Sequence, residues 1–445
     1  MTGERVGIVG GGILGMTLAH RLREAGLQPT ILEAAPQSGG LASSHRIGGY
    51  TWDRFYHVIL LSDAHLRALL HELGLSDQLR WGTTRTGFYT DGTLYSMSDV
   101  FEFLRFPPLS LVDKIRLAGT ILYASRLRDW KPLEAIPVTD WLSRLSGRHT
   151  FERIWLPLLK SKLGENYRVA SAAFIWAIIA RMYAARRSGL KKEMFGYVEG
   201  GYDTILRRFR DRLEGNGVEI LCGRSVSGVH DMGGEVRVEF QGGDHQLFDK
   251  LVLTIPSPRI AAVCPQLSKA EQDRLNGVVY QGIICGSMLV RKPLADYYVT
   301  NITENWVPFT AVIEMTALLD RAHFDGLSLV YLPRYVTQTD PAWEATDGEL
   351  WEANFEALER MYPDFDRRDV VATQMARVRE MLAVSTLGYS DRVLPPLSTS
   401  LPNVYVANSS QIANGTLNVE ETVTLAERQA GALASLLRPA IAVQV

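Results

Sequence analysis

The sequence predicts an α/β fold, in which a discontinuous Rossmann-like domain is combined with a second domain of mixed α+β structure. Two observations support the first domain. A short apolar run at residues 6–9 stops at a glycine-rich turn, and a helical pattern of apolar residues follows it directly. The third observation is length, because 445 residues exceed what one hydrophobic core usually serves, and a hydrophobic content of 46% is enough for two cores.

The glycine-rich turn has the pattern Gly10-x-Gly12-x-x-Gly15, with Ile13 and Leu14 inside it. The first glycine permits a sharp turn, the second lets backbone approach a pyrophosphate, and the third lets the helix pack on the strand. The N-terminus of the helix then presents free N–H groups and the positive end of its dipole to phosphates. The pattern therefore predicts a dinucleotide-binding turn.

A second strand is expected at residues 29–32, after the helix ends at Gly26. It places Glu33 and Ala34 at its carboxyl end, beside the glycine-rich turn. A carboxylate at this position accepts hydrogen bonds from both hydroxyls of a ribose, and it repels the additional phosphate of NADP. We therefore expect Glu33 to bind the adenosine ribose of a dinucleotide, and the adjacent Ala34 to contact the cofactor.

A second glycine pair follows in the segment Ser38-Gly39-Gly40-Leu41-Ala42-Ser43-Ser44. Such a loop suits a long cofactor that is anchored at both ends, and a nicotinamide site does not require it. Glu33 followed by this segment resembles the extended FAD-binding signature of the superfamily of flavin-containing amine oxidases, protoporphyrinogen oxidases and phytoene desaturases. UDP-galactopyranose mutases carry a related signature. The resemblance implies an FAD cofactor in contact with Gly39, Gly40, Leu41, Ala42 and Ser43.

The resemblance continues in residues 196–202, in residues 252–256 and near the carboxyl end. It implies that Val226 lies where backbone groups contact the adenine, and that Val419 belongs to the final helix, whose N-terminus faces the flavin. Where the superfamily usually has Gly-Asp, this chain has Asn408-Ser409. Neutral hydrogen-bonding groups therefore replace an acid near the ribityl chain, and either of them can still bond a hydroxyl.

The resemblance implies an FAD-binding domain made of residues 1–60, 193–260 and 385–445. The other residues, 61–192 and 261–384, form a substrate-binding or lid domain. In its first part we expect a helix over 63–73, a hairpin around Asp91-Gly92, a helix capped by Thr139 and a helix over 151–163. In its second part, four residues either line a substrate pocket or fill the core: Trp306, Phe309, Glu314 and Tyr331.

The segment from Trp52 to His57 follows the second glycine loop, and in the resembled superfamily this region passes beside the isoalloxazine ring. We expect His57 to accept a proton while a hydride leaves the substrate; the alternative is an imidazole that is hydrogen-bonded for structure. Arg54 and Tyr56 are expected to fix an anionic or polar group. The resemblance thus implies an FAD-dependent oxidoreductase that dehydrogenates a small or lipid-like substrate by hydride transfer to flavin N5. Its electron acceptor is O2, a quinone or another molecule.

Two other functions stay open. In a nucleotide-sugar mutase, reduced flavin N5 is a nucleophile toward an anomeric carbon, and the cations Arg54, Lys160 and Lys162, or those in residues 186–192, bind the diphosphate. Lys160 and Lys162 are otherwise solvated, or they hold an acidic substrate. The third function is FAD binding without turnover, which the missing Gly-Asp pair favours.

Composition and charge exclude several other classes. A net charge of −2 provides no basic surface for nucleic acid. The cysteines Cys222, Cys264 and Cys285 have no metal-ligand spacing, so we expect no metal site, no disulfide framework and a cytoplasmic, reducing location. The chain enters its first strand almost at once, so we also expect no cleaved signal peptide.

No apolar run reaches the roughly 18 residues of a membrane span. Residues 109–127 and 171–183 come closest, and both patterns are amphipathic. In one interpretation they are helices that cover a core. In the other they form a surface that rests on a membrane, makes the protein peripheral to it and admits a lipid-like substrate.

Overall fold

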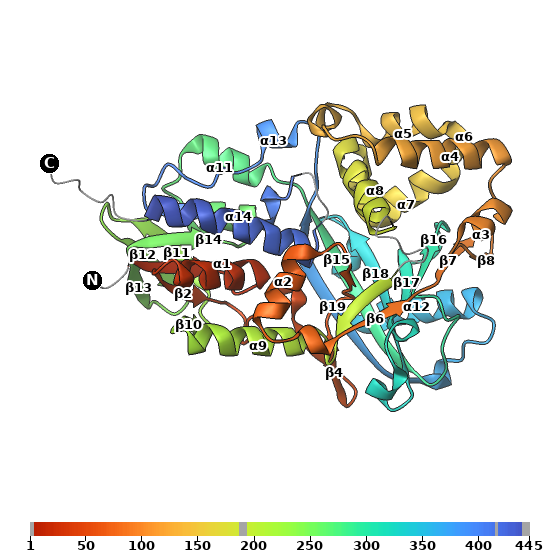
Figure 1. Ribbon diagram of the computed structural model, residues 1–445, viewed down its shortest axis with the longest axis horizontal. Helices are drawn as coiled ribbons and strands as arrows, with labels where there is room; N and C mark the ends of the chain where they lie inside the picture. The colour runs from red at the N-terminus through yellow and green to blue at the C-terminus, as the bar shows by residue number, and fades with distance from the viewer. Residues whose placement is uncertain (1–3, 187–193, 414–416, 438–445) are drawn as a thin grey trace.

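A computed structural model describes residues 4–186, 194–413 and 417–437. The amino-terminal and carboxyl-terminal parts of the chain meet in one half of the molecule, around a parallel sheet (Figure 1). A seven-stranded sheet and a group of helices form the other half. This is the mixed α/β architecture that the sequence predicts.

The parallel sheet has five strands in the order β10-β2-β1-β14-β20. Their bounds are Arg5–Val9 (β1), Gln28–Leu32 (β2), Glu219–Leu221 (β10), Lys250–Leu253 (β14) and Val404–Val406 (β20). Val9, the last residue of β1, pairs with Leu32 on one side and with Leu253 on the other. The apolar run after Arg5 is therefore the central strand, which explains why it is buried throughout.

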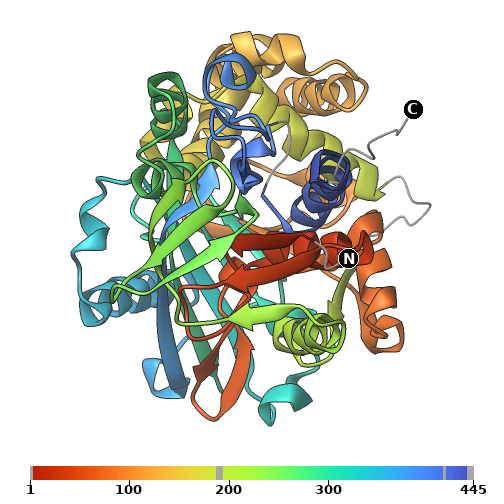
Figure 2. The ribbon, with the colours of Figure 1, turned by 90° about the vertical axis from the view of Figure 1, so that its left-hand side faces the viewer.

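Helices cover one face of this sheet and a small antiparallel sheet covers the other (Figure 2). Val6 and Ile8 pack toward the helices α1 (Ile13–Glu24), α9 (Gly201–Gly215) and α14 (Val419–Leu437), and α2 (Ala64–Glu72) lies against α14. Val9 and Leu32 pack toward β11 (Val226–Asp231), β12 (Val236–Phe240) and β13 (His245–Phe248). Alternate residues along each strand therefore pack into two different hydrophobic cores, one on each face of the sheet.

The seven-stranded sheet has the order β19-β15-β18-β17-β16-β7-β8. Its strands are β7 (Thr86–Thr90), β8 (Thr93–Ser96), β15 (Tyr280–Val290), β16 (Val299–Ile302), β17 (Ala311–Glu314), β18 (Ser328–Val336) and β19 (Val370–Ala383), and α12 (Asp347–Met361) packs on it. The predicted hairpin is confirmed as β7 and β8, because Asp91 and Gly92 have the φ values of +51° and +70° that a two-residue turn needs. Two smaller sheets pair β3 (Ser44–Ile47) with β4 (Tyr50–Asp53), and β5 (Ile59–Leu60) and β6 (Leu79–Thr83) with β9 (Met194–Val198).

The helical group contains α3 (Val100–Arg105), α4 (Leu111–Ala124), α5 (Val138–Ser146), α6 (Arg148–Thr150), α7 (Leu156–Leu163) and α8 (Ala172–Arg186). The prediction that Thr139 caps a helix is wrong, because α5 begins before it, at Val138, with Pro137 as N-cap. Residues 151–163 are helical as expected, but the first part is a π-helical turn, Phe151–Trp155, that leads into α7. Pro157 has no N–H to continue the regular hydrogen bonds through this turn.

The helices α10 (Ser257–Val263) and α11 (Lys269–Asn276) pack on the half that holds the parallel sheet. Cys264, Leu267 and Leu275 share a buried cluster with Val9 and Leu32. The domain limits of the sequence analysis stay a prediction, and this packing favours moving the limit near residue 260 to the end of α11.

Candidate functional site

The first glycine-rich turn connects β1 to α1 at the carboxyl end of the parallel sheet. Gly10 has a φ of +112°, and a Cβ atom on it would lie 2.4 Å from Oγ1 of Thr254. A Cβ atom on Gly15 would lie 2.0 Å from the carbonyl oxygen of Gly10. On Gly12, by contrast, it would meet nothing nearer than Cα of Gly40, at 3.8 Å. Packing therefore requires Gly10 and Gly15, whereas Gly12 leaves open backbone where a pyrophosphate would approach.

The second glycine loop lies on the first, backbone to backbone. The N–H of Gly39 donates to the carbonyl oxygen of Gly11 over 2.7 Å, and Gly12 forms a β-bridge with Gly39. Gly39 and Gly40 have φ values of +136° and +57°, which glycine adopts without strain. The two loops therefore form one continuous backbone surface at the edge of the sheet.

The other predicted cofactor residues of these loops lie around this backbone surface. Ile13 and Leu14 are buried in the first turn of α1, whose N–H groups have no acceptor within the helix. Leu41 and Ser43 are half-buried, and Ala42 is buried. The structure thus brings the two loops of the predicted site together.

Glu33 lies at the carboxyl end of β2, beside the first glycine turn. Its Oε2 accepts a hydrogen bond from the N–H of Gly11 over 2.7 Å, and its Oε1 accepts one from the N–H of Ala35 over 2.8 Å. Ala34, between them in sequence, is exposed. Two backbone donors fix the carboxylate, and its remaining lone pairs can accept further bonds from hydroxyl groups.

Val226 is half-buried at the start of β11. The chain reaches it after running along the end of β2: Leu221 pairs with Leu32, and the N–H of Arg224 donates to the carbonyl oxygen of Glu33 over 2.8 Å. Val226 therefore lies on the segment that passes the predicted ribose-binding acid.

Asn408 follows β20 and is fully buried. Its side-chain amide donates to the carbonyl oxygen of Ile255 over 2.9 Å and to Oγ of Ser257 over 3.2 Å. Its Oδ1 accepts from the N–H of Ser410 over 3.1 Å and from the hydroxyl over 2.5 Å. These hydrogen bonds occupy the side-chain amide of Asn408. Of the predicted pair Asn408 and Ser409, we therefore expect only Ser409, which is half-buried, to contact a cofactor hydroxyl.

Val419 begins α14 and is half-buried. The N-terminus of this helix also meets α2, because the carboxylate of Glu420 accepts hydrogen bonds from the N–H groups of His65 and Leu66 over 3.1 Å and 2.7 Å. Residues 414–416 of the preceding predicted turn lie outside the described residues.

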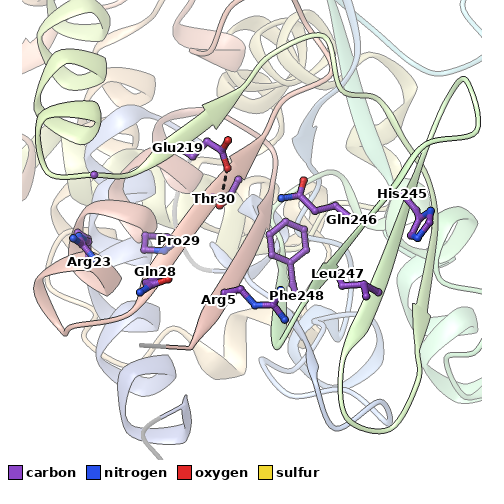
Figure 3. Close-up of a pocket in the computed structure, with 11 residues that line it drawn as sticks. Arg5, Arg23, Gln28, Pro29, Thr30, Glu219, His245, Gln246, Leu247 and Phe248 are labelled. Atoms are coloured by element: carbon purple, nitrogen blue, oxygen red, sulfur yellow. Dashed lines mark hydrogen bonds between the residues drawn. The ribbon is translucent and has the colours of Figure 1, made fainter. Parts of the chain in front are cut away.

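A surface groove of about 740 Å³ lies at the other end of the parallel sheet (Figure 3). Arg5 and Gln28, the first residues of β1 and β2, line it together with Phe248. Because these strands are parallel, the groove lies at their amino ends, opposite the glycine loops. Open α/β sheets bind their ligands at the carboxyl ends, so we do not assign the cofactor to this groove.

Asp53 and His57 lie together beside Tyr202. Asp53 is buried, its Oδ1 accepts the N–H of Tyr202 over 2.7 Å, and burial raises its pKa to about 8. The rings of His57 and Tyr202 are 4.8 Å apart, and burial lowers the pKa of His57 to about 4. The Nδ1 atom of His57 lies 3.9 Å from Oδ2 of Asp53, too far for a hydrogen bond. At pH 7 both side chains are therefore mainly neutral.

His57 is enclosed by other residues, yet 18% of its side chain is accessible and its Nδ1 has no hydrogen-bond partner among the described residues. Arg54 behaves in the same way: it is half-buried, its Nε has no partner in the described part of the chain, and burial lowers its pKa. Buried polar atoms without a partner are uncommon in folded proteins, and a bound ligand is one way in which such atoms gain a partner.

Tyr56 makes a hydrogen bond between its hydroxyl and that of Tyr335, over 2.7 Å. The hydroxyl of Tyr335 also accepts a hydrogen bond from Nζ of Lys162 over 2.6 Å. Sequence reasoning gave Asp53 and Tyr335 no role and grouped Lys162 with Lys160. A signal for Lys162 was available, because it shares a helical face with the buried Leu159.

Among the four candidates for a pocket wall, Tyr331 lies at this site, since its hydroxyl donates to the carbonyl oxygen of Asp53 over 2.6 Å. Glu314 is buried and accepts hydrogen bonds from the N–H groups of residues 294–296, which is a structural role. Phe309 belongs to a core cluster. The guanidinium of Arg360 lies over the ring of Trp306, at 3.8 Å from its centroid.

His20, Glu24 and Glu72 form a cluster whose nitrogen and oxygen atoms lie within 4.8 Å of one another. Arg21 pairs with both carboxylates over 2.9 Å and with Glu427 over 2.7 Å. The guanidinium already supplies the positive charge that a metal ion would bring, so we assign no metal to this cluster.

These residues fit a long dinucleotide. The open backbone at Gly12, the N-terminus of α1 and the carboxylate of Glu33 provide for a pyrophosphate and a ribose. Farther along the same segment of chain, Arg54 and His57 hold buried polar atoms that have no partner among the described residues.

The sequence model of one protein family, described as flavin containing amine oxidoreductase, matches residues 15–434. A coproporphyrinogen III oxidase of Mycobacterium leprae (strain TN) is 27% identical over 292 residues, which are 60% of this chain and 63% of that protein. The chain thus aligns with less than two thirds of the length of this relative.

Solved structures share the fold at low sequence identity. A structure from Exiguobacterium sp. 255-15 that carries the provisional name protoporphyrinogen oxidase has a TM-score of 0.78 and 21% identity, over 98% of this chain and 99% of that one. Reduced UDP-galactopyranose mutase has a TM-score of 0.73 and 14% identity, over 98% of this chain and 96% of that one. At these sequence identities, the two similarities show a shared fold only.

Proposed function

Because the chain belongs to the family of flavin-containing amine oxidoreductases, with FAD as its cofactor, we propose that it oxidises an organic substrate by hydride transfer to the flavin. The observation that carries this proposal is the contact between the two glycine loops, Gly39 N–H to Gly11 carbonyl, with Glu33 fixed beside them. Bound FAD supplies the hydride acceptor. The loops and Glu33 bind and orient the cofactor, and the segment 52–57 orients the substrate.

The proposed substrate is an organic molecule that loses a hydride from carbon and a proton from nitrogen, oxygen or carbon. Coproporphyrinogen III is the first compound to test, because relatives similar in sequence are named coproporphyrinogen III oxidases. O2 and quinones are the electron acceptors to compare.

The first experiment is a visible spectrum of the purified protein, followed by anaerobic reduction with dithionite and exposure to air. Flavin absorbance that bleaches and returns quickly supports an oxidase, and a slow return supports a dehydrogenase with another acceptor. Anaerobic mixing with coproporphyrinogen III then tests the substrate, with bleaching as the expected result. A colourless protein that takes up no added FAD would contradict the proposal.

The nucleotide-sugar mutase remains the second candidate function. Its diphosphate site needs exposed cations, but Lys162 is engaged with Tyr335 and Arg54 is half-buried. Residues 187–192, the other predicted cations, lie outside the described residues, and of Arg186 only the backbone is described. Isomerisation of a UDP-sugar by the reduced protein, without net oxidation, would favour the mutase. A flavin that no electron donor reduces would favour binding without turnover.

We also propose that α3 and α4 form a membrane-docking patch, which gives a lipid-like substrate access to the protein. Six large apolar side chains are between 51% and 73% exposed there: Val100, Phe101, Leu104, Leu111, Val112 and Ile115. The exposed positions of α4 hold Arg116 and no carboxylate, so the patch suits an anionic lipid surface. None of the helices in the described part of the chain combines the length and apolar character that a membrane crossing requires.

Co-sedimentation with vesicles tests the membrane-docking patch. The wild type is expected to bind vesicles that contain phosphatidylglycerol more strongly than vesicles of phosphatidylcholine alone. The double substitution Val112→Glu, Ile115→Glu should reduce binding by about tenfold or more, because two inserted apolar side chains are lost. The matched control is Val371→Glu, since Val371 is an exposed valine on β19. Equal binding of all three proteins would contradict the docking role.

A further inference from the structure

Lys162, Tyr335 and Tyr56 form a hydrogen-bonded chain inside the molecule. Nζ of Lys162 lies 2.6 Å from the hydroxyl oxygen of Tyr335, which lies 2.7 Å from that of Tyr56. The three residues come from α7, from β18 and from the segment after β4, so tertiary packing alone brings them together. Lys162 points inward because it shares a face of α7 with Leu159 and Leu163, which are 2% and 0% exposed.

The amino group of Lys162 has no carboxylate partner among the described residues. The elements packed against α7 are the π-turn 151–155, the 3-10 turn 164–168, β16 and β18, and their other charged groups are paired elsewhere. The pairs are Glu152 with Arg148, Arg153 with Asp91, Glu165 with Arg168, and Arg334 with Asp340. The titratable groups that face the chain are therefore Tyr56, Tyr335 and the buried thiol of Cys285.

Burial governs the protonation of these groups. It lowers the pKa of Lys162, with a smaller opposing effect from Tyr56, and no carboxylate offsets it. Burial also raises the pKa of Tyr335 to about 12, raises that of Tyr56 well above its usual value, and raises that of the Cys285 thiol. The phenols and the thiol thus stay protonated at neutral pH, and Lys162 is the group whose charge changes most easily.

The direction of the chain depends on the charge of Lys162. An ammonium donates to Tyr335, Tyr335 donates to Tyr56, and the hydrogen of the Tyr56 hydroxyl is left to donate outward. With a neutral amine every bond reverses, and the oxygen of Tyr56 becomes an acceptor. The protonation state of Lys162 therefore decides whether the hydroxyl of Tyr56 donates or accepts a hydrogen bond at the other end of the hydrogen-bonded chain.

The far end of the chain lies at the candidate site. Tyr56 is half-buried and adjacent in sequence to His57, and its ring is 6.3 Å from that of Tyr331, whose hydroxyl donates to the carbonyl oxygen of Asp53. His57 is a poor base at neutral pH, because burial lowers its pKa to about 4. A nearby group with a higher pKa than His57 is therefore a better acceptor for a proton that the substrate releases.

We propose that Lys162 is this acceptor and that Tyr56 and Tyr335 conduct the proton to it. The inference rests on the proposed oxidation of a substrate by bound FAD. Bound FAD would be the oxidant, taking the hydride with its electron pair as the carbon–hydrogen bond of the substrate breaks. The bond from hydrogen to nitrogen or oxygen of the substrate breaks too, its electron pair forms the new double bond, and the proton goes to Tyr56. Tyr56 passes its own proton to Tyr335, and Tyr335 passes one to Nζ of Lys162.

The test compares Lys162→Met and Lys162→Arg with the wild type in anaerobic flavin reduction by coproporphyrinogen III, from pH 6 to 10. In the wild type, the rate constant should rise with pH as Lys162 becomes neutral and then level off. Both variants should be slower by about a hundredfold or more and should lose this rise, because neither side chain accepts a proton. Lys160→Met is the matched control, and Tyr335→Phe should give the same loss by interrupting the chain.

A second readout does not require turnover. NMR of the full-length protein carrying ¹⁵N-labelled lysine should show an amino group with lowered pKa that is missing in Lys162→Met and present in Lys160→Met. Rescue by Lys162→Arg, or a rate that falls as pH rises, would overturn the proposal and indicate an anion-binding cation instead. An unaltered pH profile in both Lys162 variants would overturn it as well. A protein that holds no FAD would contradict the proposed function alone, since the NMR titration still reports on Lys162.

Discussion

At the scale of single residues, the glycines of the first turn differ in what they are needed for. A Cβ atom on Gly15 would collide with the carbonyl oxygen of Gly10, at 2.0 Å, but on Gly12 it would have room. We therefore expect Gly12→Val to abolish FAD retention and to lower the free energy of unfolding of the apoprotein by less than about 2 kcal/mol, the most that a poor N-cap residue costs.

Gly15→Ala is the matched comparison, and it should destabilise the apoprotein by about 3 kcal/mol or more. Absorbance of FAD retained after desalting and urea unfolding of the apoprotein measure the two effects. A yellow, FAD-saturated Gly12→Val protein would contradict the assignment of the pyrophosphate site.

The buried carboxyl of Asp53 predicts a pH dependence of stability. Because burial raises its folded-state pKa to about 8, the folded protein binds one more proton at this residue than the unfolded chain from about pH 4 to pH 8. Its contribution to stability is complete below about pH 4 and declines as pH rises, by about 1.4 kcal/mol per pH unit. His57 opposes this trend between about pH 4 and its unfolded value near 6.5.

Asp53→Asn keeps an oxygen acceptor for the N–H of Tyr202 and removes the titration. The difference in free energy of unfolding between variant and wild type, from urea titrations at pH 5 to 8, should therefore increase with pH. A constant difference would show that Asp53 ionises normally in the folded protein.

At the scale of elements, α14 joins the carboxyl end of the chain to the cofactor half by packing on α1 and by capping α2. The carboxylate of Glu420 satisfies two N–H groups in the first turn of α2, where it also meets the positive end of the helix dipole. Glu420→Ala should lower the free energy of unfolding by about 1 kcal/mol. Glu356→Ala, an exposed position on α12, is the control and should stay within about 0.5 kcal/mol of the wild type. Equal effects of the two changes in urea unfolding would remove the capping role.

At the scale of the whole molecule, the cofactor site combines β1, β2, the second glycine loop and the carboxyl-terminal strand and helix. A ligand that binds only this assembled arrangement stabilises the folded state by mass action, by about 2.7 kcal/mol at one hundred times its Kd. Added FAD should therefore raise the Tm of the apoprotein, and Glu33→Ala should shift the FAD concentration required upward. A Tm that does not respond to FAD would contradict the assembled site.

The sequence could place Gly10, Gly12, Gly15 and Glu33, because a strand, a turn and a helix in succession have local signals in glycine spacing and hydrophobic period. It misplaced the start of α5, where Pro137 is the N-cap, and it did not foresee the π-turn before Pro157. Helix ends depend on single residues and on the partners of backbone groups, which a period of apolar residues does not encode.

The buried polar groups around Tyr56 show what the sequence alone does not determine. Tyr56 and Tyr335 are 279 residues apart in sequence, and Lys162 and Tyr335 are 173 apart. The sequence alone specified the glycine loops and the acid that follows β2, because each rests on neighbouring residues, and the resemblance to the flavin-dependent superfamily implied the FAD-binding architecture. Only the tertiary structure decided that internal hydrogen bonds occupy the side-chain amide of Asn408, and that Lys162 has no carboxylate partner within residues 4–186, 194–413 and 417–437. Hydrogen bonding and desolvation depend on which distant segments enclose a group, and those appear only when the chain is folded.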